Sequence, residues 1–207
     1  MTVTKKQIVS WLERSIEVFS AQQDLLTSLD REIGDADHGL NMNRGFKKVN
    51  EKLPSISDKD IGTILKTTGI TLLSSIGGAS GPLYGTFFIR CASLVMAKEE
   101  LSLRDLTEML QGGIDGIKDR GKAEIGDKTM IDTFSGILSS LKLNQGKRVV
   151  EAINLAAEAG EVATKSTIPM IAKKGRASYL GERSIGHQDP GATSASLLFN
   201  CLRDAVK

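Results

Sequence analysis

The chain has 207 residues, of which 40% are hydrophobic, 25% are charged and 4% are aromatic, and its formal net charge is +2. This length predicts one domain over residues 1–207 with a mainly aliphatic core, and the mild charge argues against a nucleic-acid partner. There is no apolar signal-peptide core and no apolar run of membrane length, so we expect a cytoplasmic protein without a membrane contact. Cys91 and Cys201, the only thiols, lie in apolar runs and are expected to be buried and free.

Apolar residues recur at three- and four-residue intervals, and no segment shows sustained apolar–polar alternation, which together predict an all-α protein without a sheet. Eight helices with short links indicate an antiparallel, up-and-down bundle or barrel. The first four expected helices are one carrying Ile8 to Phe19, one over 40–53 ended by Pro54, one capped by Ser57 and stopped at Gly77, and one from Pro82 to Leu94. The last four are one opened by a capping box at Ser102, one from Thr129 or Thr133 to Leu143, one over 149–172 bent near Pro169, and one from Asp189 to the chain end.

Acids concentrate at the first predicted helix junction, where Asp30, Asp35 and Asp37 lie close together in sequence. Two neighbouring glycines let the backbone turn so that the three carboxylates face one point. Clustered carboxylates repel one another unless a cation offsets their charge, and Mg²⁺ is favoured because few carboxylates leave it open positions for phosphate oxygens. The spacing does not fit a calcium EF-hand, because no glutamate stands at its last ligand position. A polar turn whose acids only cap helices is the structural alternative.

The segment Gly77–Pro82 is a glycine-rich turn between two predicted helices. Glycines permit a close approach to a phosphate, the free amides of a helix N-terminus attract anions, and Ser80 adds a hydroxyl. The segment lacks the lysine of a Walker loop. A tight helix connection explains the turn equally well.

The segment Gly121–Met130 is another polar turn bounded by glycine. The thioether of Met130 would pack well on an adenine ring, although a methionine in a first helical turn is more often plain core. Neither this turn nor the rest of the chain shows a Ser-His-Asp or Cys-His relay, so we predict no catalytic side chain.

The link over residues 173–189 is long and rich in glycine and positive charge, and it ends where Asp189 and Pro190 open a helix. Such a loop is typical of a phosphate clamp, and a solvated basic loop is the alternative. In an up-and-down arrangement this link, the acidic junction and both glycine turns emerge at the same end. The candidate cations of the link are Lys173, Lys174, Arg176, Arg183 and His187.

Together these motifs resemble those of the ADP-binding L subunits of phosphotransferase-dependent dihydroxyacetone kinases, over essentially the whole chain. The resemblance implies an eight-helix antiparallel barrel with a nucleotide at one end, and Asp30, Asp35 and Asp37 would bind two Mg²⁺ ions that bridge the ADP phosphates. The motifs that carry it are Gly34–Gly45, Gly77–Pro82, Gly121–Met130 and Gly175–Ala192. The nucleotide-binding residues that it implies are His38, Gly39, Leu40, Asn41, Ala79, Ser80, Gly121, Met130, Arg176, Asp189, Pro190 and Gly191.

The resemblance also implies a function. ADP would be a retained coenzyme that a phosphohistidine subunit, M, phosphorylates to ATP, and the γ-phosphoryl group would pass to dihydroxyacetone on a separate K subunit. With 207 residues, no room is expected for a fused sugar-binding domain. Three alternatives stay open: a kinase subunit that exchanges ATP without a phosphohistidine donor, a regulatory module that contacts a transcription regulator, and a phosphohistidine carrier that uses His38 or His187.

Overall fold

The computed structural model describes residues 2–207, which are mostly helical, and this confirms the predicted all-α class. Two short 3₁₀ helices and one pair of two-residue strands complete the structure within these residues. The elements are β1 (Val3–Thr4), α1 (Lys5–Ala21), α2 (Gln23–Ile33), α3 (His38–Lys52), η1 (Leu53–Ser55), α4 (Ile61–Ser75), α5 (Ser80–Ser93), β2 (Glu100–Leu101), α6 (Leu103–Gly121), α7 (Met130–Leu143), α8 (Val149–Ser166), η2 (Arg176–Ser184) and α9 (Pro190–Ala205).

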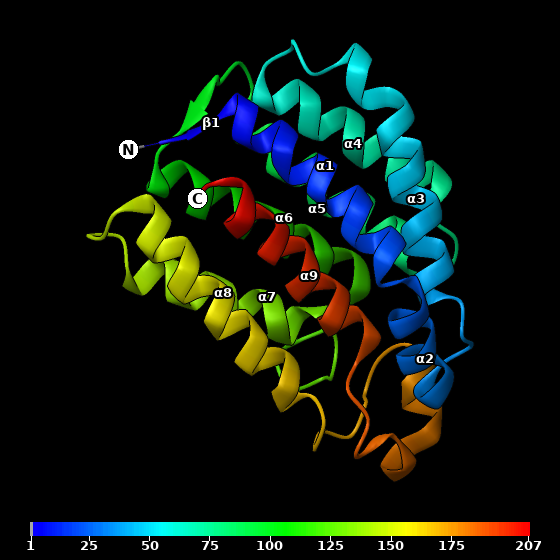
Figure 1. The fold of residues 1–207 in the computed structure, drawn as a ribbon. Coiled ribbons are helices and arrows are strands. Elements are labelled where there is room, and N and C mark those ends of the chain that lie inside the picture. Colours follow the sequence, from blue (N-terminus) through cyan, green and yellow to red (C-terminus); the bar gives the residue numbers. More distant parts are fainter. Residues whose placement is uncertain (1) are drawn as a thin grey trace.

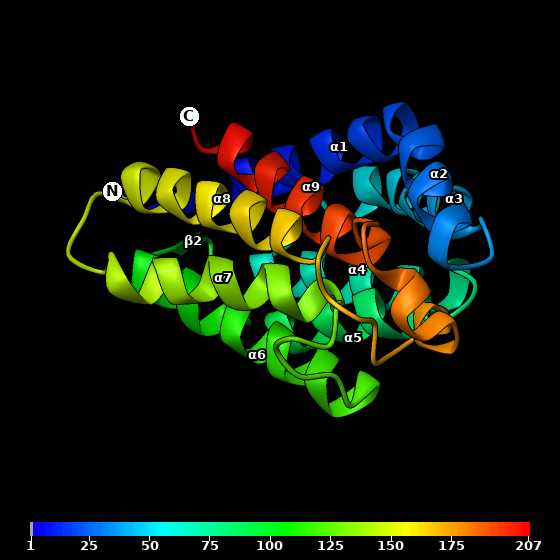
Figure 2. The ribbon, with the colours of Figure 1, turned by 90° about the horizontal axis from the view of Figure 1, so that it is seen from below.

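The helices form a closed ring, as expected for a helical barrel (Figures 1 and 2). Going round the ring, α1 packs against α3, α3 against α4, α4 against α5, α5 against α6 and α6 against α7. Helix α9 contacts both α7 and α1 and so closes the ring, and α8 packs on α7 and α9. Figure 1 shows α2 at the end of the ring away from the two chain termini. Within residues 2–207, every helix is too short or too polar to span a bilayer.

All aromatic side chains except that of Tyr179 are buried in the core of the ring. Phe87 stacks on Phe134 with ring centroids 4.9 Å apart, and Trp11 lies 5.6 Å from Phe88. The Trp11 indole donates a hydrogen bond to the carbonyl oxygen of Leu198 at 2.8 Å, which ties α1 to α9 without leaving a buried polar group unpaired. Each fully buried aliphatic or aromatic side chain contributes about 1.5–3 kcal/mol. This core fixes the helix ends on which the site is built.

Two predicted helix starts are confirmed by their capping contacts. Thr129, rather than Thr133, caps α7, because its hydroxyl accepts the N–H of Ile131 at 3.1 Å. Ser102 and Asp105 form the expected capping box at the start of α6.

All eight predicted helices are present, and α2 is an additional helix that the apolar spacing did not indicate. It follows α1 directly after Gln22, so Asp30 lies on a helix rather than in a loop. The predicted capping role of Ser57 is wrong. Asp60 caps α4 instead, because its carboxylate accepts the N–H of Thr63 at 3.1 Å and so satisfies a first-turn amide.

Two further predictions are corrected. Helix α8 ends at Ser166 and does not reach Ala172, because the hydroxyl of Thr167 bonds back to a backbone carbonyl and Pro169 has no N–H with which to continue the helix. A small sheet exists although none was expected: β1 and β2 pair antiparallel with Val3 opposite Leu101. Two residues per strand are too few to show an alternating pattern in the sequence.

Candidate functional site

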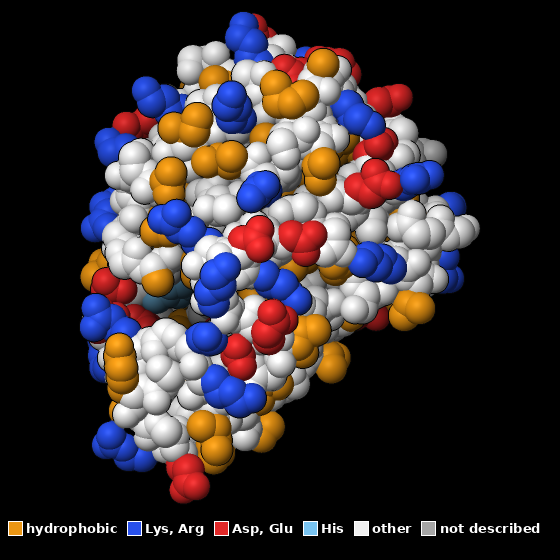
Figure 3. Space-filling view, turned by 180° about the vertical axis from the view of Figure 1, so that it is seen from behind, with side chains coloured by type: hydrophobic (Ala, Val, Ile, Leu, Met, Phe, Trp, Pro, Cys, Tyr) orange, Lys and Arg blue, Asp and Glu red, His pale blue; other side chains and the backbone are white. Residues whose placement is uncertain are grey.

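Four turns at one end of the ring line a cavity of about 450 Å³, within the usual size range of small-molecule sites. Figure 3 shows a hollow at the left edge of the molecule, where a histidine lies deep between acidic and basic side chains. The turns are those expected to converge: the α2–α3 junction, the turn before α5, the turn before α7 and the link before α9. The predicted residues that line the cavity are Asp30, Asp35, Asp37, His38, Ala79, Ser80, Gly121, Met130, Arg176, Asp189, Pro190 and Gly191.

One wall of the cavity is acidic. The carboxylates of Asp30, Asp35 and Asp37 each offer an oxygen, and these oxygens lie within 4.8 Å of one another. Asp30 Oδ2 accepts the backbone N–H groups of Asp37 at 2.9 Å and His38 at 3.1 Å, so it caps α3 from the preceding helix. Arg176 Nε donates to Asp35 Oδ2 at 2.9 Å, so the cluster already attracts one cationic side chain.

Glycine is required where this acidic wall is built. A Cβ atom on Gly34 would lie 2.0 Å from Asp30 Oδ1, and one on Gly39 would lie 2.0 Å from the carbonyl oxygen of Gln23. Real Cβ atoms essentially never come so close. The two glycines therefore let α2 and α3 approach one another with the acidic residues between them.

The start of α5 forms the neighbouring wall. Gly78 has a φ of +63°, and the helix then begins at Ser80 with Ala79 as its N-cap residue. No side chain in the described chain caps this end, in contrast to α4, α6, α7 and α9. The first-turn amides that Pro82 does not remove are therefore free to receive an anion from the cavity.

His38 joins the acidic wall to the start of α5 through a buried polar network. Its Nδ1 lies 3.0 Å from Ser80 Oγ and its Nε2 lies 2.9 Å from Ser194 Oγ, which in turn lies 2.7 Å from the Tyr84 hydroxyl. Burial lowers the pKa of His38, and the nearby carboxylates only partly oppose this. His38 is therefore neutral near pH 7, with both ring nitrogens occupied.

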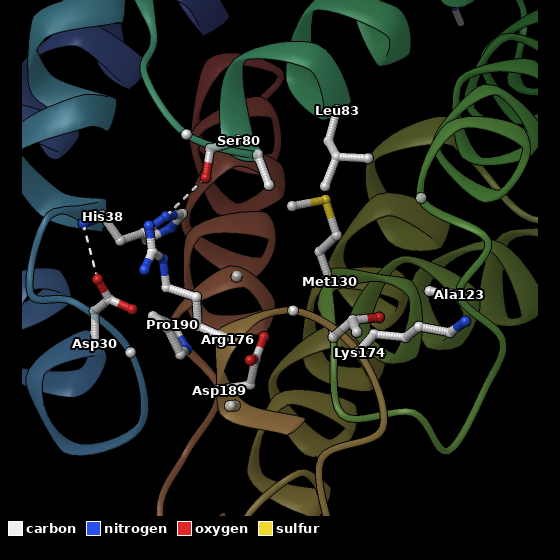
Figure 4. Close-up of a pocket in the computed structure, with 18 of the residues that line it drawn as sticks. Asp30, His38, Ser80, Leu83, Ala123, Met130, Lys174, Arg176, Asp189 and Pro190 are labelled. Carbon is white, nitrogen blue, oxygen red and sulfur yellow. Dashed lines mark hydrogen bonds between the residues drawn. The ribbon is translucent and has the colours of Figure 1, made fainter. Parts of the chain in front are cut away.

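The opposite wall is apolar. Figure 4 shows the side chains of Leu83 and Met130 pointing toward one another on the side of the cavity away from Asp30. The remaining apolar side chains of this wall come from α6, from the turn after it and from the start of α7, and they are Ile117, Ala123 and Ile131. A slot between aliphatic side chains and a thioether suits a flat aromatic ring.

The link over residues 167–189, here called the strap, covers the cavity from the side of α8. Lys174 and Arg176 line the cavity, and Figure 4 shows the Arg176 side chain reaching toward His38. Three glycines of the strap adopt positive φ angles: Gly175 at +65°, Gly181 at +56° and Gly186 at +90°. The strap is not an irregular loop, because η2 occupies its middle.

The other predicted cations of the strap do not line the cavity. Lys173 lies 3.8 Å from an Asp127 oxygen, His187 Nδ1 lies 3.9 Å from a Glu32 oxygen, and Arg183 lies outside the lining. Only part of the basic loop therefore faces the site.

Three predicted nucleotide-binding residues also lie outside the lining. Gly39 packs against α2, the side chain of Leu40 is half exposed, and Asn41 Oδ1 accepts a hydrogen bond from Arg44 at 2.6 Å. Conversely, no sequence signal indicated that Leu83 would line the cavity, because it continues the helical spacing of core residues. Ile117 and Ile131 follow the same spacing and were missed for the same reason.

A family model described as the DAK2 domain matches residues 32–204 of the chain. The chain belongs to the DAK2-domain family. It is 58% identical, over the full length of both chains, to the PEP-dependent dihydroxyacetone kinase, ADP-binding subunit DhaL, of Escherichia coli strain K12. It is 39% identical to the PTS-dependent dihydroxyacetone kinase, ADP-binding subunit DhaL, of Lactococcus lactis, over 96% of each chain. These findings confirm the resemblance drawn from the motifs.

The fold of this DAK2 domain is also similar to a crystal structure of the dihydroxyacetone kinase from C. freundii in complex with AMP-PNP and Mg²⁺. The TM-score is 0.71 and the identity is 25%, over 95% of this chain. The chain spans 33% of the C. freundii kinase.

The DAK2 domain carries a further acid, Asp189, in the cavity lining. Asp189 caps α9 by accepting the N–H of Ala192 at 2.6 Å, and its side chain is buried beside Met130 and Gly191. Burial raises the pKa of Asp189 to about 7, although the Ala192 amide and the charge of Lys128 oppose the shift. Asp189 is therefore largely protonated below pH 7, and in that form it is a poor metal ligand.

Proposed function

We propose that this DAK2 domain is the nucleotide-holding subunit of a dihydroxyacetone kinase and acts as one unit over residues 1–207. It would retain Mg²⁺-ADP as a coenzyme, accept a phosphoryl group from a phosphohistidine subunit, M, and deliver it from ATP to dihydroxyacetone on a K subunit, giving dihydroxyacetone phosphate. The observation that carries the proposal is the placement of an acidic cluster, an uncapped helix start and an apolar slot around one cavity. The full-length similarity to subunits named for ADP binding supports it.

The residues of the acidic wall fit a hard divalent cation. Asp30, Asp35 and Asp37 offer oxygen ligands only, and oxygen is what Mg²⁺ prefers. We propose that the three carboxylates hold two Mg²⁺ ions, and the presence of Mg²⁺ in the C. freundii complex supports a magnesium site in this fold. Mg²⁺ bound there would offset the negative charge of the transferring phosphoryl group.

The remaining walls supply binding and orientation. The α5 amides and Ser80 would hold phosphate oxygens, Arg176 and Lys174 would add positive charge, and the slot at Met130 would receive the base. Gly39, Leu40 and Asn41 would support these residues from behind. Because phosphoryl transfer depends mainly on positioning and charge stabilisation, these contacts suffice without a nucleophilic side chain.

The geometry argues against His38 as a phosphohistidine carrier. Both ring nitrogens already have hydrogen-bond partners, and the side chain is buried. An incoming phosphoryl group would need one nitrogen free and exposed. We therefore propose that the phosphoryl group is carried on the bound nucleotide and not on His38. His187 is more exposed, and acid-labile phosphate on the protein would implicate it instead.

Analysis of freshly purified protein tests the proposal. The protein is denatured, and the released nucleotide and metal are identified by chromatography and elemental analysis. We expect ADP together with magnesium. Adding K, phosphorylated M and dihydroxyacetone should then give dihydroxyacetone phosphate without added ATP. Absence of both nucleotide binding and Mg²⁺ binding, even at millimolar concentrations, would contradict the proposal.

A kinase subunit that exchanges ATP without a phosphohistidine donor is the second candidate. The relative with the similar fold was crystallised with AMP-PNP, an ATP analogue, and this observation favours an exchanging site. Turnover with free ATP, K and dihydroxyacetone in the absence of M would support it. Slow exchange of labelled ADP would support the coenzyme proposal.

A transcription regulator is a further proposed partner, and the cytoplasm is the proposed location. The two thiols, Cys91 and Cys201, are free and buried, which agrees with a reducing compartment. If the chain serves only regulation, it should bind a regulator while failing to support phosphoryl transfer with K and M.

A further inference from the structure

Lys128 is a buried charged residue for which the proposed function has no use. Its side chain is only 1% exposed, at the turn before α7. The ammonium group donates to the carbonyl oxygens of Met170 at 3.1 Å, Ser184 at 2.5 Å and Ile168 at 3.5 Å. An ammonium group has three protons, and all three are directed to these carbonyls. Lys128 therefore has no donor left for a phosphate in the cavity.

The three carbonyls belong to the two limbs of the strap. Ile168 and Met170 lie on the limb that leaves α8, and Ser184 lies on the limb that returns to α9. The limbs also touch one another here, because the N–H of Gly186 donates to the Ile168 carbonyl at 2.8 Å and the N–H of Ala172 donates to Ser184 Oγ at 2.9 Å. These contacts form the neck of the strap. Lys174 and Arg176 lie beyond the neck and face the cavity.

Burying a charge in this place is costly unless its hydrogen bonds are satisfied. Burial lowers the pKa of Lys128, while the three carbonyl partners and the neighbouring carboxylate of Asp189 favour the charged form. Charge-assisted hydrogen bonds are stronger than neutral ones, so a single ammonium can hold two segments together. An apolar side chain of the same length would leave the carbonyls without this partner.

We propose that Lys128 is a positioning residue that clasps the neck of the strap and thereby holds Arg176 and Lys174 over the nucleotide. The inference rests on the proposed function in assigning the strap to nucleotide retention. Lys128 immediately precedes Thr129, the cap of α7, and lies two residues before Met130. It therefore also ties the apolar wall, which is proposed to hold the base, to the strap, which is proposed to hold the phosphates. Lys128 is itself among the residues that line the cavity, but its ammonium donors are taken by the strap carbonyls, so its effect on the nucleotide passes through the strap.

The test compares Lys128→Met with Lys128→Arg and with Lys165→Met, a matched exchange of an exposed lysine near the end of α8. Release of radiolabelled ADP is followed in Mg²⁺ with excess unlabelled ADP. We expect about fivefold faster release from Lys128→Met, because charge-assisted bonds at the neck are lost. Lys128→Arg keeps the charge and hydrogen-bond donors, so it should release ADP more slowly than Lys128→Met. Lys165→Met should release ADP at the wild-type rate.

A double-mutant cycle with Arg176→Ala separates positioning from a merely structural role. If Lys128 acts through the strap, Lys128→Met should speed release less than twofold once Arg176 is absent, because contacting or coupled positions are not additive. Trypsin should also cut within residues 173–183 faster in nucleotide-free Lys128→Met than in wild type. Wild-type release and cutting rates, or an undiminished fivefold effect in the Arg176→Ala background, would overturn the inference.

Two further arms keep the test decisive. If Lys128→Met does not fold, Ser184→Ala removes the hydrogen bond from the Ala172 N–H across the same neck, together with a local bond to the Gly181 carbonyl, and leaves Lys128 in place. That variant must then release ADP faster and be cut faster, and wild-type rates in it would overturn the clasp. If wild-type protein binds no ADP, the proposed function fails, whereas the nucleotide-free trypsin comparison still decides whether Lys128 holds the strap.

Discussion

The polar and apolar walls of the cavity are built in different ways. The polar wall consists of residues in turns and at helix ends, such as Asp35 and Arg176, that stand partly in solvent and contact one another across segments. The apolar wall consists of helix residues, such as Leu83 and Ile117, whose side chains continue the core. The polar wall therefore depends on charge and ionic conditions, while the apolar wall depends on packing. A ligand with a charged end and a flat apolar end suits both.

Loss of an acid from the polar wall should have the largest effect. Asp35→Ala removes a proposed metal ligand, and we expect the affinities for Mg²⁺-ADP and for Mg²⁺-pyrophosphate to fall together by about a hundredfold. Calorimetry on both ligands measures this. Asp24→Asn, an exposed acid on the preceding helix α2, is the control and should bind both ligands normally. If Asp35→Ala holds ADP as tightly as wild type, the polar wall does not carry the phosphates.

A change in the apolar wall should separate the two ligands. Leu83→Ala shortens a side chain that faces Met130, and we expect ADP affinity to fall about tenfold through lost apolar contact while pyrophosphate affinity stays unchanged. Leu94→Ala alters a half-exposed leucine at the other end of α5 and should leave both affinities unchanged. An equal loss of both ligands in Leu83→Ala would show that the walls do not act separately.

The sequence revealed the polar wall far better than the apolar one. Acids, glycines and cations near predicted helix junctions are conspicuous, so residue type and spacing alone were enough to select Asp30, Ser80 and Arg176 as candidates. Leu83 and Ile131 could not be selected in this way, because a residue that lines a cavity and a residue that fills a core obey the same helical spacing. The spacing of apolar residues therefore predicts the all-α fold class but not which of these residues line the cavity.

Element boundaries show a similar limit. The break between α1 and α2 occurs at Gln22, where neither proline nor glycine marks it. The early end of α8 depends on Thr167, whose hydroxyl donates to the Thr164 carbonyl and accepts the N–H of Asp189. The second of these contacts joins positions far apart in sequence, so local propensity does not reveal it.

Asp189 lies between the two walls and is a buried carboxyl group. In the folded state its pKa is about 7, whereas the ordinary value is 3.8, so the folded protein keeps a proton that the unfolded chain releases between these values. Its contribution to stability is therefore greatest at low pH and is lost as the pH rises toward 7. Asp189→Asn should remove this slope, about 1.4 kcal/mol per pH unit between about pH 5 and 6. Urea unfolding of nucleotide-free wild type and variant at several pH values measures the difference. Parallel pH profiles would contradict it.

The smallest expected effect concerns Arg176, which contacts Asp35 while its side chain is 68% exposed. Solvent screens such a pair, so its intrinsic contribution is at most about 1 kcal/mol. Arg176→Ala should nevertheless act in two directions. Mg²⁺ alone should bind up to about twofold more tightly, because a competing cation leaves Asp35. ADP in Mg²⁺ should bind about fivefold more weakly, because a charge-assisted contact to phosphate is lost.

The salt dependence of Arg176→Ala distinguishes this exchange of partners from a change in packing. The tighter Mg²⁺ binding and the weaker ADP binding of Arg176→Ala should both diminish between about 0.05 and 0.5 M salt, because salt screens partly exposed charges. The control is Arg183→Ala, which removes a strap cation outside the cavity lining and should change neither affinity. The Leu83→Ala effect should persist over the same range because burial of apolar surface is not screened. If Arg176→Ala weakens metal and nucleotide alike, the arginine does not compete for Asp35, and its contribution lies in holding the acidic wall together.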